Sequence, residues 1–254
     1  MIKLDLFDLF LLLGFLAIAI TLSLWQKLEL ESQFLLAAGR CILQLLMIGS
    51  IIEFIFEFNH PLPVLLIIVV MVTISTQVVK NRIGKQIKGL FPIVFGSILL
   101  STLFTLSYTL ILIIEPTKWY DPQYLIPLVG LLLGNTINSA SLAGERLASN
   151  IKNNRLEIET YLSLGATPFE AIKNYRKQAI KVSLIPTLNN MMVMGLVSLP
   201  GIFTGQVLAG SPPLEAASYQ ILVVFMIAIT NLIMTSLITT GVYRKFFNDQ
   251  LQLI

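Results

Sequence analysis

Apolar residues occur in long, nearly uninterrupted runs along this chain, and polar residues are mostly confined to the short segments between the runs. An α-helix needs roughly 20 mostly apolar residues to cross about 30 Å of hydrocarbon. The runs that meet this length are residues 6–25, 34–58, 62–79, 90–114, 124–147, 187–210 and 219–242. The pattern predicts an all-α integral membrane protein with about seven transmembrane helices, and residues 1–254 as a single membrane domain.

The composition supports this prediction. Of the 254 residues, 56% are hydrophobic and only 12% are Asp, Glu, Lys or Arg, about half of the charged share in a soluble domain. One cysteine, Cys41, cannot form a disulfide within the chain, and one histidine, His60, cannot supply a histidine-rich metal site. The net charge of +3 is too small to indicate a nucleic-acid partner. Membrane lipid is therefore the expected surrounding of most of the surface.

Lys and Arg residues are distributed unevenly among the connecting segments. Most of the 17 lie in segments that a strict alternation places on one side: Lys27, Lys80, Arg82, Lys85, Lys88, Lys152, Arg155, Lys173, Arg176, Lys177, Lys181, Arg244 and Lys245. The other side has only Lys3 and Lys118, together with several acidic residues. Because cytoplasmic loops are enriched in Lys and Arg, the pattern predicts a multi-pass plasma-membrane protein with its amino terminus outside and its carboxyl terminus in the cytoplasm.

Residues 148–186 form the one long segment between the apolar runs, and the charge pattern places it in the cytoplasm. Apolar residues recur at helical spacing in both halves, which predicts two amphipathic helices. Gly165 is suited to end the first helix, because glycine adopts a left-handed conformation without a steric penalty. Thr167, Pro168 and Glu170 then fit the N-cap, first and third positions of a second helix with a capping box. We expect a fixed helical elbow that docks a soluble partner; the alternative is a helix lying on the lipid headgroups.

Several polar residues interrupt the apolar runs. Those of the fifth run lie three or four residues apart and share one helix face: Asn135, Asn138, Ser141 and Glu145. Asn189 and Asn190 begin the sixth run, Pro200 and Gly201 interrupt it with an expected kink or unwound stretch, and Glu53 lies in the second run. Because polar groups are costly at membrane depth, these residues are candidates for a translocation pathway, with packing between helices as the alternative.

Motifs that carry chemistry are few. The sequence has no Walker A motif, and its one His and one Cys lie on different predicted helix ends, so we expect neither a Ser-His-Asp nor a Cys-His site. We therefore expect neither catalysis nor a bound cofactor in this chain. Met191, Met192 and Met194 precede the interruption of the sixth run, and a methionine cluster in an apolar helix indicates packing more often than a metal site. No metal ligands are assigned from the sequence.

The predicted elbow resembles the EAA-type coupling segment of ABC transporter permeases, with Glu159 and Gly165 at the Glu and Gly positions of that segment. In such permeases this segment contacts the ATPase. The residues for which the resemblance and the capped turn imply this contact are Glu159, Leu164, Gly165, Ala166, Thr167, Pro168 and Glu170.

A second resemblance covers nearly the whole chain and is densest from about residue 127 onward. It runs through residues 162–168, 184–187, 195–201, 209–210, 219–221 and 243–246. These stretches look like the FetB-type permease family, whose bacterial members are linked to iron export and whose plant relatives are linked to aluminium tolerance. The resemblance implies the permease subunit of an ATP-driven ABC transporter in a bacterial cell membrane, exporting iron or another metal ion. It also implies a permease homodimer and a separate FetA-type ATPase subunit that binds ATP and Mg.

Two other functions stay open on the residues alone. A non-transporting membrane scaffold would recruit a soluble partner through the elbow, and an ion-driven secondary carrier would need no ATPase. The interrupted sixth run and the ionisable residues within the runs favour transport over a scaffold. The lack of an obvious internal repeat in the sequence disfavours a secondary carrier.

Overall fold

The computed structural model describes residues 6–58, 60–84, 87–116, 118–248 and 250–253; Lys3 and Lys85 of the charge pattern lie outside these residues. Within them, every regular element is helical apart from two isolated bridges. The all-α prediction is therefore confirmed. The chain divides between residues 59 and 60 into two compact units.

The first unit is a pair of helices, α1 (Leu6–Gln26) and α2 (Glu31–Phe58). The Ser23 hydroxyl closes the connection between them, because it donates to Glu31 Oε1 at 2.8 Å and accepts the Leu30 N–H at 3.3 Å. Most of the described side chains of both helices are exposed, although the helices are strongly apolar. Such surfaces are expected in lipid or against other apolar helices.

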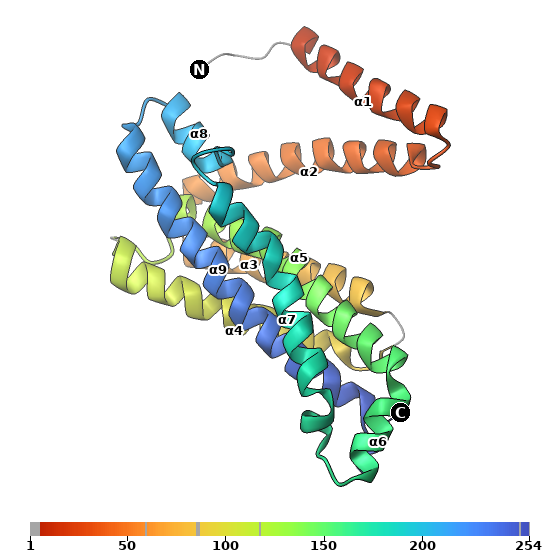
Figure 1. Cartoon of the computed structure of the whole chain (residues 1–254). Coiled ribbons are helices and arrows are strands. Elements are labelled where there is room, and N and C mark those ends of the chain that lie inside the picture. Colours follow the sequence, from red (N-terminus) through yellow and green to blue (C-terminus); the bar gives the residue numbers. More distant parts are fainter. Residues whose placement is uncertain (1–5, 59, 85–86, 117, 249, 254) are drawn as a thin grey trace. The chain divides into compact units, whose positions relative to one another are not determined.

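The second unit contains α3 (Pro61–Gly84), α4 (Leu90–Thr109), α5 (Pro122–Asn153), α6 (Arg155–Ser163), α7 (Pro168–Val193), α8 (Gly201–Leu208) and α9 (Pro213–Tyr243). A π-helical turn, Leu110–Ile114, continues α4, and a 3-10 turn, Arg244–Phe246, continues α9. α5 packs against α3, α7 and α9, and α9 also packs against α4 and α8 (Figure 1). The pairs in contact show that α3, α5 and α9 run in one direction and that α4 and α7 run in the other.

Hydroxyl side chains line the contact between α4 and α9. On α4 they recur every four residues and are buried: Ser97, Ser101, Thr105 and Thr109. Thr230 on α9 donates to Thr105 Oγ1 at 2.8 Å, and the Ser101 hydroxyl lies 3.8 Å from the sulfur of Met234. The outward face of α4 instead carries large apolar side chains that are half exposed or more: Leu100, Leu103, Phe104 and Tyr108. This arrangement, polar inside and apolar outside, fits helices surrounded by lipid.

Five helices in the described residues are long and apolar enough to cross a membrane, compared with seven predicted. They are Glu31–Phe56, Pro61–Gly84, Leu90–Ile114, Pro122–Asn153 and Pro213–Phe246. The predicted first span, residues 6–25, coincides with α1, Leu6–Gln26, within which Leu13–Gln26 is apolar. The predicted sixth span is divided, because α7 begins at Pro168, passes residue 186 without a break and ends at Val193. The predicted boundary at residue 186 is therefore not a helix end, because α7 continues through it into the sixth apolar run. Hydropathy shows where a helix becomes apolar, and this point differs from the residue at which the helix begins.

α3 and α5 approach each other closely at Gly144. A Cβ atom at this position would lie 2.6 Å from Ile83 Cγ1. We expect Gly144→Ala to push the helices apart and to lower the free energy of unfolding by about 1–3 kcal/mol, seen as a lower unfolding temperature in detergent. Gly134→Ala on the same helix is the matched control, because no atom lies within 4 Å of its Cβ position. Equal stability of the two variants would contradict the close packing.

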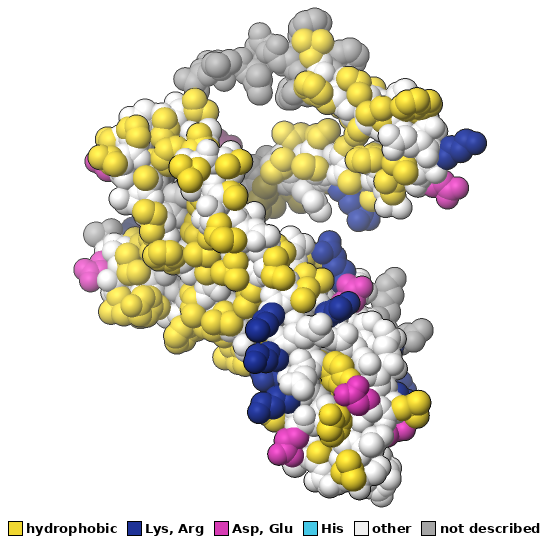
Figure 2. Space-filling view, viewed as in Figure 1, with side chains coloured by type: hydrophobic (Ala, Val, Ile, Leu, Met, Phe, Trp, Pro, Cys, Tyr) yellow, Lys and Arg dark blue, Asp and Glu magenta, His cyan; other side chains and the backbone are white. Residues whose placement is uncertain are grey.

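Lys and Arg residues gather at one end of the second unit, which we call the basic end. Five helix ends come together there: the ends of α3, α5 and α9 and the starts of α4 and α7. The basic residues that define this end are Lys80, Arg82, Lys88, Lys152, Lys173, Lys177, Arg244 and Lys245. Figure 2 shows dark blue side chains below a broad yellow, apolar surface. The connections from α4 to α5 and from α8 to α9 lie at the opposite end.

Candidate functional site

The elbow is the turn between α6 and α7 together with the helix ends on either side of it. α6 ends in a Schellman motif: the Ala166 N–H donates to Tyr161 O and the Gly165 N–H donates to Leu162 O, both at 3.0 Å. Gly165 has φ +90°, as this motif requires. Because both terminal bonds are made, the end of α6 has a fixed direction. The predicted helix end at Gly165 is confirmed.

A capping box begins α7 directly after this turn. Thr167 Oγ1 accepts the Glu170 N–H at 3.3 Å, and Glu170 Oε2 accepts the Thr167 N–H at 2.8 Å. Pro168 occupies the first helical position, where its missing N–H has no consequence. The predicted capping box is confirmed, and the elbow is ordered on both sides of the turn.

The capping box makes the elbow sensitive to acid. Hydrogen bonds from Thr167 lower the pKa of Glu170 below its ordinary value of 4.5. A carboxylate with a lowered pKa stabilises the fold above its ordinary pKa, and this contribution is lost as the pH falls through the lowered value. We therefore expect the protection of the Thr167 and Glu170 amides, measured as their hydrogen exchange relative to the intrinsic rate at each pH, to be high at neutral pH and to fall in acid. Glu170→Gln, which accepts hydrogen bonds without titrating, should remove this step; an unchanged step would contradict the assignment.

Side-chain contacts brace α6 against α7. The Tyr175 hydroxyl donates to Glu157 Oε2 at 2.6 Å, from one helix to the other. Burial and this carboxylate raise the pKa of Tyr175 to about 12, so the hydroxyl stays a donor at physiological pH. On α6, Arg155 and Glu159 form an ion pair at 2.7 Å. Glu159, the first predicted coupling residue, is therefore already paired within its own helix.

The elbow exposes large apolar side chains at the basic end. Leu156 and Leu164 are 81% and 79% exposed, and Tyr161 and Phe169 are 46% and 41% exposed. Leu164 is one of the predicted coupling residues, and it follows α6 directly. Apolar side chains presented by a rigid, capped turn suit contact with another protein.

Arg176 connects the elbow to α9. Its guanidinium donates to Thr239 Oγ1 at 3.2 Å, to Ser236 O at 3.2 Å and to Thr240 Oγ1 at 3.0 Å. The same group lies 5.6 Å from the centre of the Phe169 ring. Charge-assisted hydrogen bonds are the stronger ones in proteins, so this contact fixes the first turns of α7 against the end of α9.

The helix interruption lies between α7 and α8, over residues 194–200. The chain turns at Gly195, which has φ +84°, and the Gly195 N–H donates to Ser198 O at 2.9 Å. Pro200 and Gly201, where the sequence predicts the interruption, form the N-cap and the first residue of α8. An unwound stretch is thus present, but it begins earlier than predicted. Gly195, directly after the methionines, is the sequence signal that marks the turn.

A small pocket lies beside this interruption, between α5, α7 and α9. Asn135 of α5 and Asn190 of α7 line it together with Thr187, Met191 and Met194, and its volume is about 60 Å³. Two of the predicted pathway residues are therefore brought together. The methionines, which the sequence assigns to packing, supply two thioether sulfurs.

Buried amide groups lie next to this pocket. Asn231 donates to Thr187 Oγ1 at 2.9 Å, and the Gln220 amide lies 3.9 Å from Met194 Sδ. Asn231 is 1% and Gln220 7% exposed, and the side-chain oxygen of each accepts no hydrogen bond. The region therefore has unused oxygen acceptors at the depth of the interruption, and buried acceptors of this kind call for an explanation.

The other residues predicted on α5 have separate surroundings. Asn138 is exposed and accepts a hydrogen bond from Arg82 at 3.2 Å. Ser141 is buried and its hydroxyl has no hydrogen-bond partner, whereas Glu145 is exposed. None of these three lines the pocket that contains Asn135.

The remaining predicted pathway residues also lie apart from the pocket lining. Asn189 is exposed and adjoins Asn190, and Pro200 and Gly201 begin α8. Glu53 is exposed on α2, in the first unit. Among the described residues, no three His, Cys, Asp or Glu side chains come together in a group that could hold a metal ion. A resident metal centre therefore has no carboxylate or histidine set to form it within that part of the chain.

Three relatives are similar to this chain over nearly its whole length. "UPF0014 membrane protein slr1647" of Synechocystis sp. is 53% identical over 254 residues, 100% of this chain and 98% of that protein. "Probable iron export permease protein FetB" of Escherichia coli is 32% identical over 237 residues, 93% of this chain and 90% of that protein. "Protein ALUMINUM SENSITIVE 3" of Arabidopsis thaliana is 33% identical over 241 residues, 93% of this chain and 85% of that protein.

The predicted resemblance to FetB-type permeases is confirmed by these relatives. No solved structure matches this chain. The profile of the family described as "Uncharacterised protein family (UPF0014)" matches residues 6–247, nearly the whole chain. This chain is a membrane protein of the UPF0014 family.

Proposed function

We propose that this chain is the membrane permease subunit of an ATP-driven ABC transporter that exports iron or another metal ion. A separate FetA-type ATPase subunit binds ATP and Mg, and two copies of the permease pair with two copies of the ATPase. The transporter lies in the bacterial plasma membrane, with the amino terminus outside and the basic end in the cytoplasm. The name of the Escherichia coli relative, a probable iron export permease, supports the substrate, and the segregation of Lys and Arg supports the orientation.

The elbow is the observation that carries this proposal. A surface helix that merely lies on headgroups has no need of a Schellman motif followed by a capping box. In this elbow both are formed, apolar side chains are exposed beside them, and α7 continues from the turn to the interruption at Val193. Force applied to the elbow by a soluble partner would therefore reach the pocket beside the interruption. A scaffold protein would need no such connection.

Reconstitution tests the function. We expect purified permease, incorporated into vesicles with a FetA-type ATPase, to accumulate iron or another metal ion across the bilayer in the presence of ATP and Mg. The same metal ion should stimulate ATP hydrolysis. Vesicles with the permease alone are the control. Transport without the ATPase would favour a secondary carrier, and ATPase binding without transport of any solute would favour a scaffold. Transport of an organic anion or a lipid, but of no metal ion, would contradict the proposed substrate.

The pocket beside the helix interruption is the proposed substrate route. Amide oxygens and thioether sulfurs are neutral ligands that can replace water around a cation. We expect Asn190→Leu to reduce metal transport at least about tenfold, equivalent to about 1.4 kcal/mol, with ATPase binding unchanged. Asn189→Leu is the matched control, since Asn189 is the neighbouring residue on α7 and does not line the pocket. Equal metal transport by the two variants would contradict the proposal that the substrate passes through this pocket.

A further inference from the structure

The described residues after the 3-10 turn form a small hook, which we define as residues 247, 248 and 250–253. Phe247 and Leu253 form an antiparallel bridge across it. Two hydrogen bonds between Asn248 and Gln252 close the turn. The Asn248 N–H donates to Gln252 O at 2.9 Å, and the Asn248 side-chain oxygen accepts the Gln252 N–H at 2.8 Å. Leu251, with φ +62°, is 57% exposed in this turn. The hook is thus fixed by its own hydrogen bonds.

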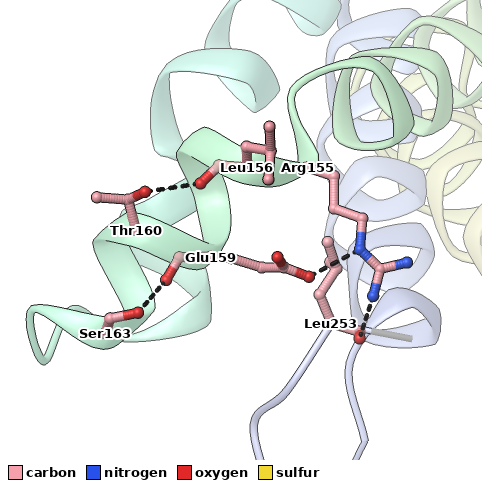
Figure 3. Close-up of polar contacts among 6 residues, drawn as sticks. All are labelled: Arg155, Leu156, Glu159, Thr160, Ser163 and Leu253. Carbon is pink, nitrogen blue, oxygen red and sulfur yellow. Dashed lines mark hydrogen bonds and ion pairs between the residues drawn. The ribbon is translucent and has the colours of Figure 1, made fainter.

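The hook is held against the elbow by Arg155. This side chain pairs with Glu159 through Nε at 2.7 Å and donates from Nη2 to the backbone oxygen of Leu253 at 3.4 Å (Figure 3). In Figure 3 the guanidinium lies between the carboxylate of α6 and the carbonyl of the hook. One arginine therefore connects the predicted coupling residue Glu159 with a segment nearly a hundred residues later in the chain.

Aromatic rings support the base of the hook. The Phe169 and Tyr243 rings lie 6.1 Å apart, and the Tyr243 and Phe247 rings lie 6.4 Å apart. These contacts connect the first turn of α7, the end of α9 and the start of the hook. Offset and edge contacts between aromatic rings at such distances are favourable. The hook is therefore held at its base as well as at Leu253.

A groove of about 690 Å³ lies between the two segments. The elbow forms one wall and the hook forms the other: the lining residues are Glu159, Leu162, Ser163, Gly165, Ala166, Gln250, Leu251, Gln252 and Leu253. The charge of Glu159 is matched by Arg155, so the lining has no unpaired charge among the described residues. Leucines alternate with amide and hydroxyl groups. These walls suit a polypeptide that inserts apolar side chains and makes hydrogen bonds around them.

We propose that this groove is the docking site for the ATP-hydrolysing subunit, with the hook as its second wall and Arg155 as the residue that positions the two walls. The inference rests on the proposed function. Its occupant is a soluble protein and not lipid, because the groove lies at the basic end, away from the broad apolar surface in Figure 2. The described lining of the groove itself contains no Lys or Arg that could bind an anionic headgroup.

The test measures the affinity of the full-length permease in lipid nanodiscs for a FetA-type ATPase. We expect Leu251→Asp to weaken binding at least about tenfold, because the described lining has no unpaired charge and the added carboxylate would be desolvated on docking. Arg155→Ala should weaken binding as well, and Arg155→Lys should restore it in part. Leu214→Asp is the matched control, since Leu214 is 84% exposed at the opposite end of the unit. Unfolding temperatures of all variants should match the wild type.

The outcomes separate the two proposals. Failure of the wild-type permease to bind any such ATPase would overturn the proposed function. If Leu251→Asp binds the ATPase with wild-type affinity while Gly165→Arg does not bind it, the hook is not part of the docking site. The proposed function would then be unaffected. If Leu251→Asp instead separates permease dimers with ATPase affinity unchanged, the groove is an interface between copies and the inference is wrong.

Discussion

Gly165→Arg is expected to abolish ATP-driven transport while the permease still inserts into the membrane. Gly165 has φ +90°, a conformation that costs other L-residues about 1–2 kcal/mol. No atom lies within 4 Å of its Cβ position, so the arginine side chain would project into the groove instead of clashing inside the protein. Both effects act on the proposed docking surface. We expect ATPase affinity to fall by more than about tenfold and ATP-dependent metal uptake by vesicles to disappear.

Gly210→Arg provides the control for strain alone. Gly210 has φ +96° and also has no atom within 4 Å of its Cβ position, but it lies between α8 and α9 at the opposite end. This variant should carry a similar backbone penalty and keep ATPase affinity. If Gly165→Arg binds the ATPase and transports as well as Gly210→Arg does, the elbow is not the docking element.

Arg176→Ala is expected to give a different defect, in which the ATPase binds and transport is lost. The variant removes three hydrogen bonds that fix α7 to α9. A hydrogen bond to a charged group contributes a net of about 1.5–3 kcal/mol after exchange with water, and bonds made by one guanidinium do not add. We expect the free energy of unfolding to fall by about 2–3 kcal/mol in total. ATP hydrolysis should continue without metal transport, because the elbow would move without moving α9.

Comparison with Lys177→Ala isolates this effect. Lys177 is the next residue along α7 and is exposed, so its removal should change neither stability nor transport. Arg176→Lys should restore only part of the wild-type behaviour, since an ammonium group cannot reproduce the planar fork of a guanidinium. Coupled transport in Arg176→Ala at wild-type rates would show that the contact with α9 is merely structural.

The elbow could be predicted from the sequence because its signals are local. A glycine at a helix end, followed within five residues by Thr, Pro and Glu in capping order, specifies the backbone almost independently of the remaining chain. The same holds for the apolar runs that define the long helices. Gly165 and Glu170 therefore have the conformations and partners that their positions in the sequence indicate.

The pocket, the Arg176 contact and the hook could not be predicted in the same way. Asn135 and Asn190 lie 55 positions apart in the sequence and meet only because α5 and α7 pack together. Arg176 contacts residues 60 to 64 positions away. Arg155 contacts Leu253 over an even longer separation. Periodicity identifies which faces are buried but not which helix covers them, so such contacts depend on the tertiary arrangement.

The continuity of α7 has a mechanical consequence. At 1.5 Å per residue, its 26 residues make a rod of about 39 Å that joins the elbow to the interrupted region. If this rod tilts by about 5° about its elbow end, its far end is displaced by about 3 Å. A displacement of that size equals about one atomic diameter, which is comparable with the width of a pocket of about 60 Å³. A modest rotation of α7 imposed at Thr167 would therefore be enough to open or close the pocket at the far end of the helix, beside Met194.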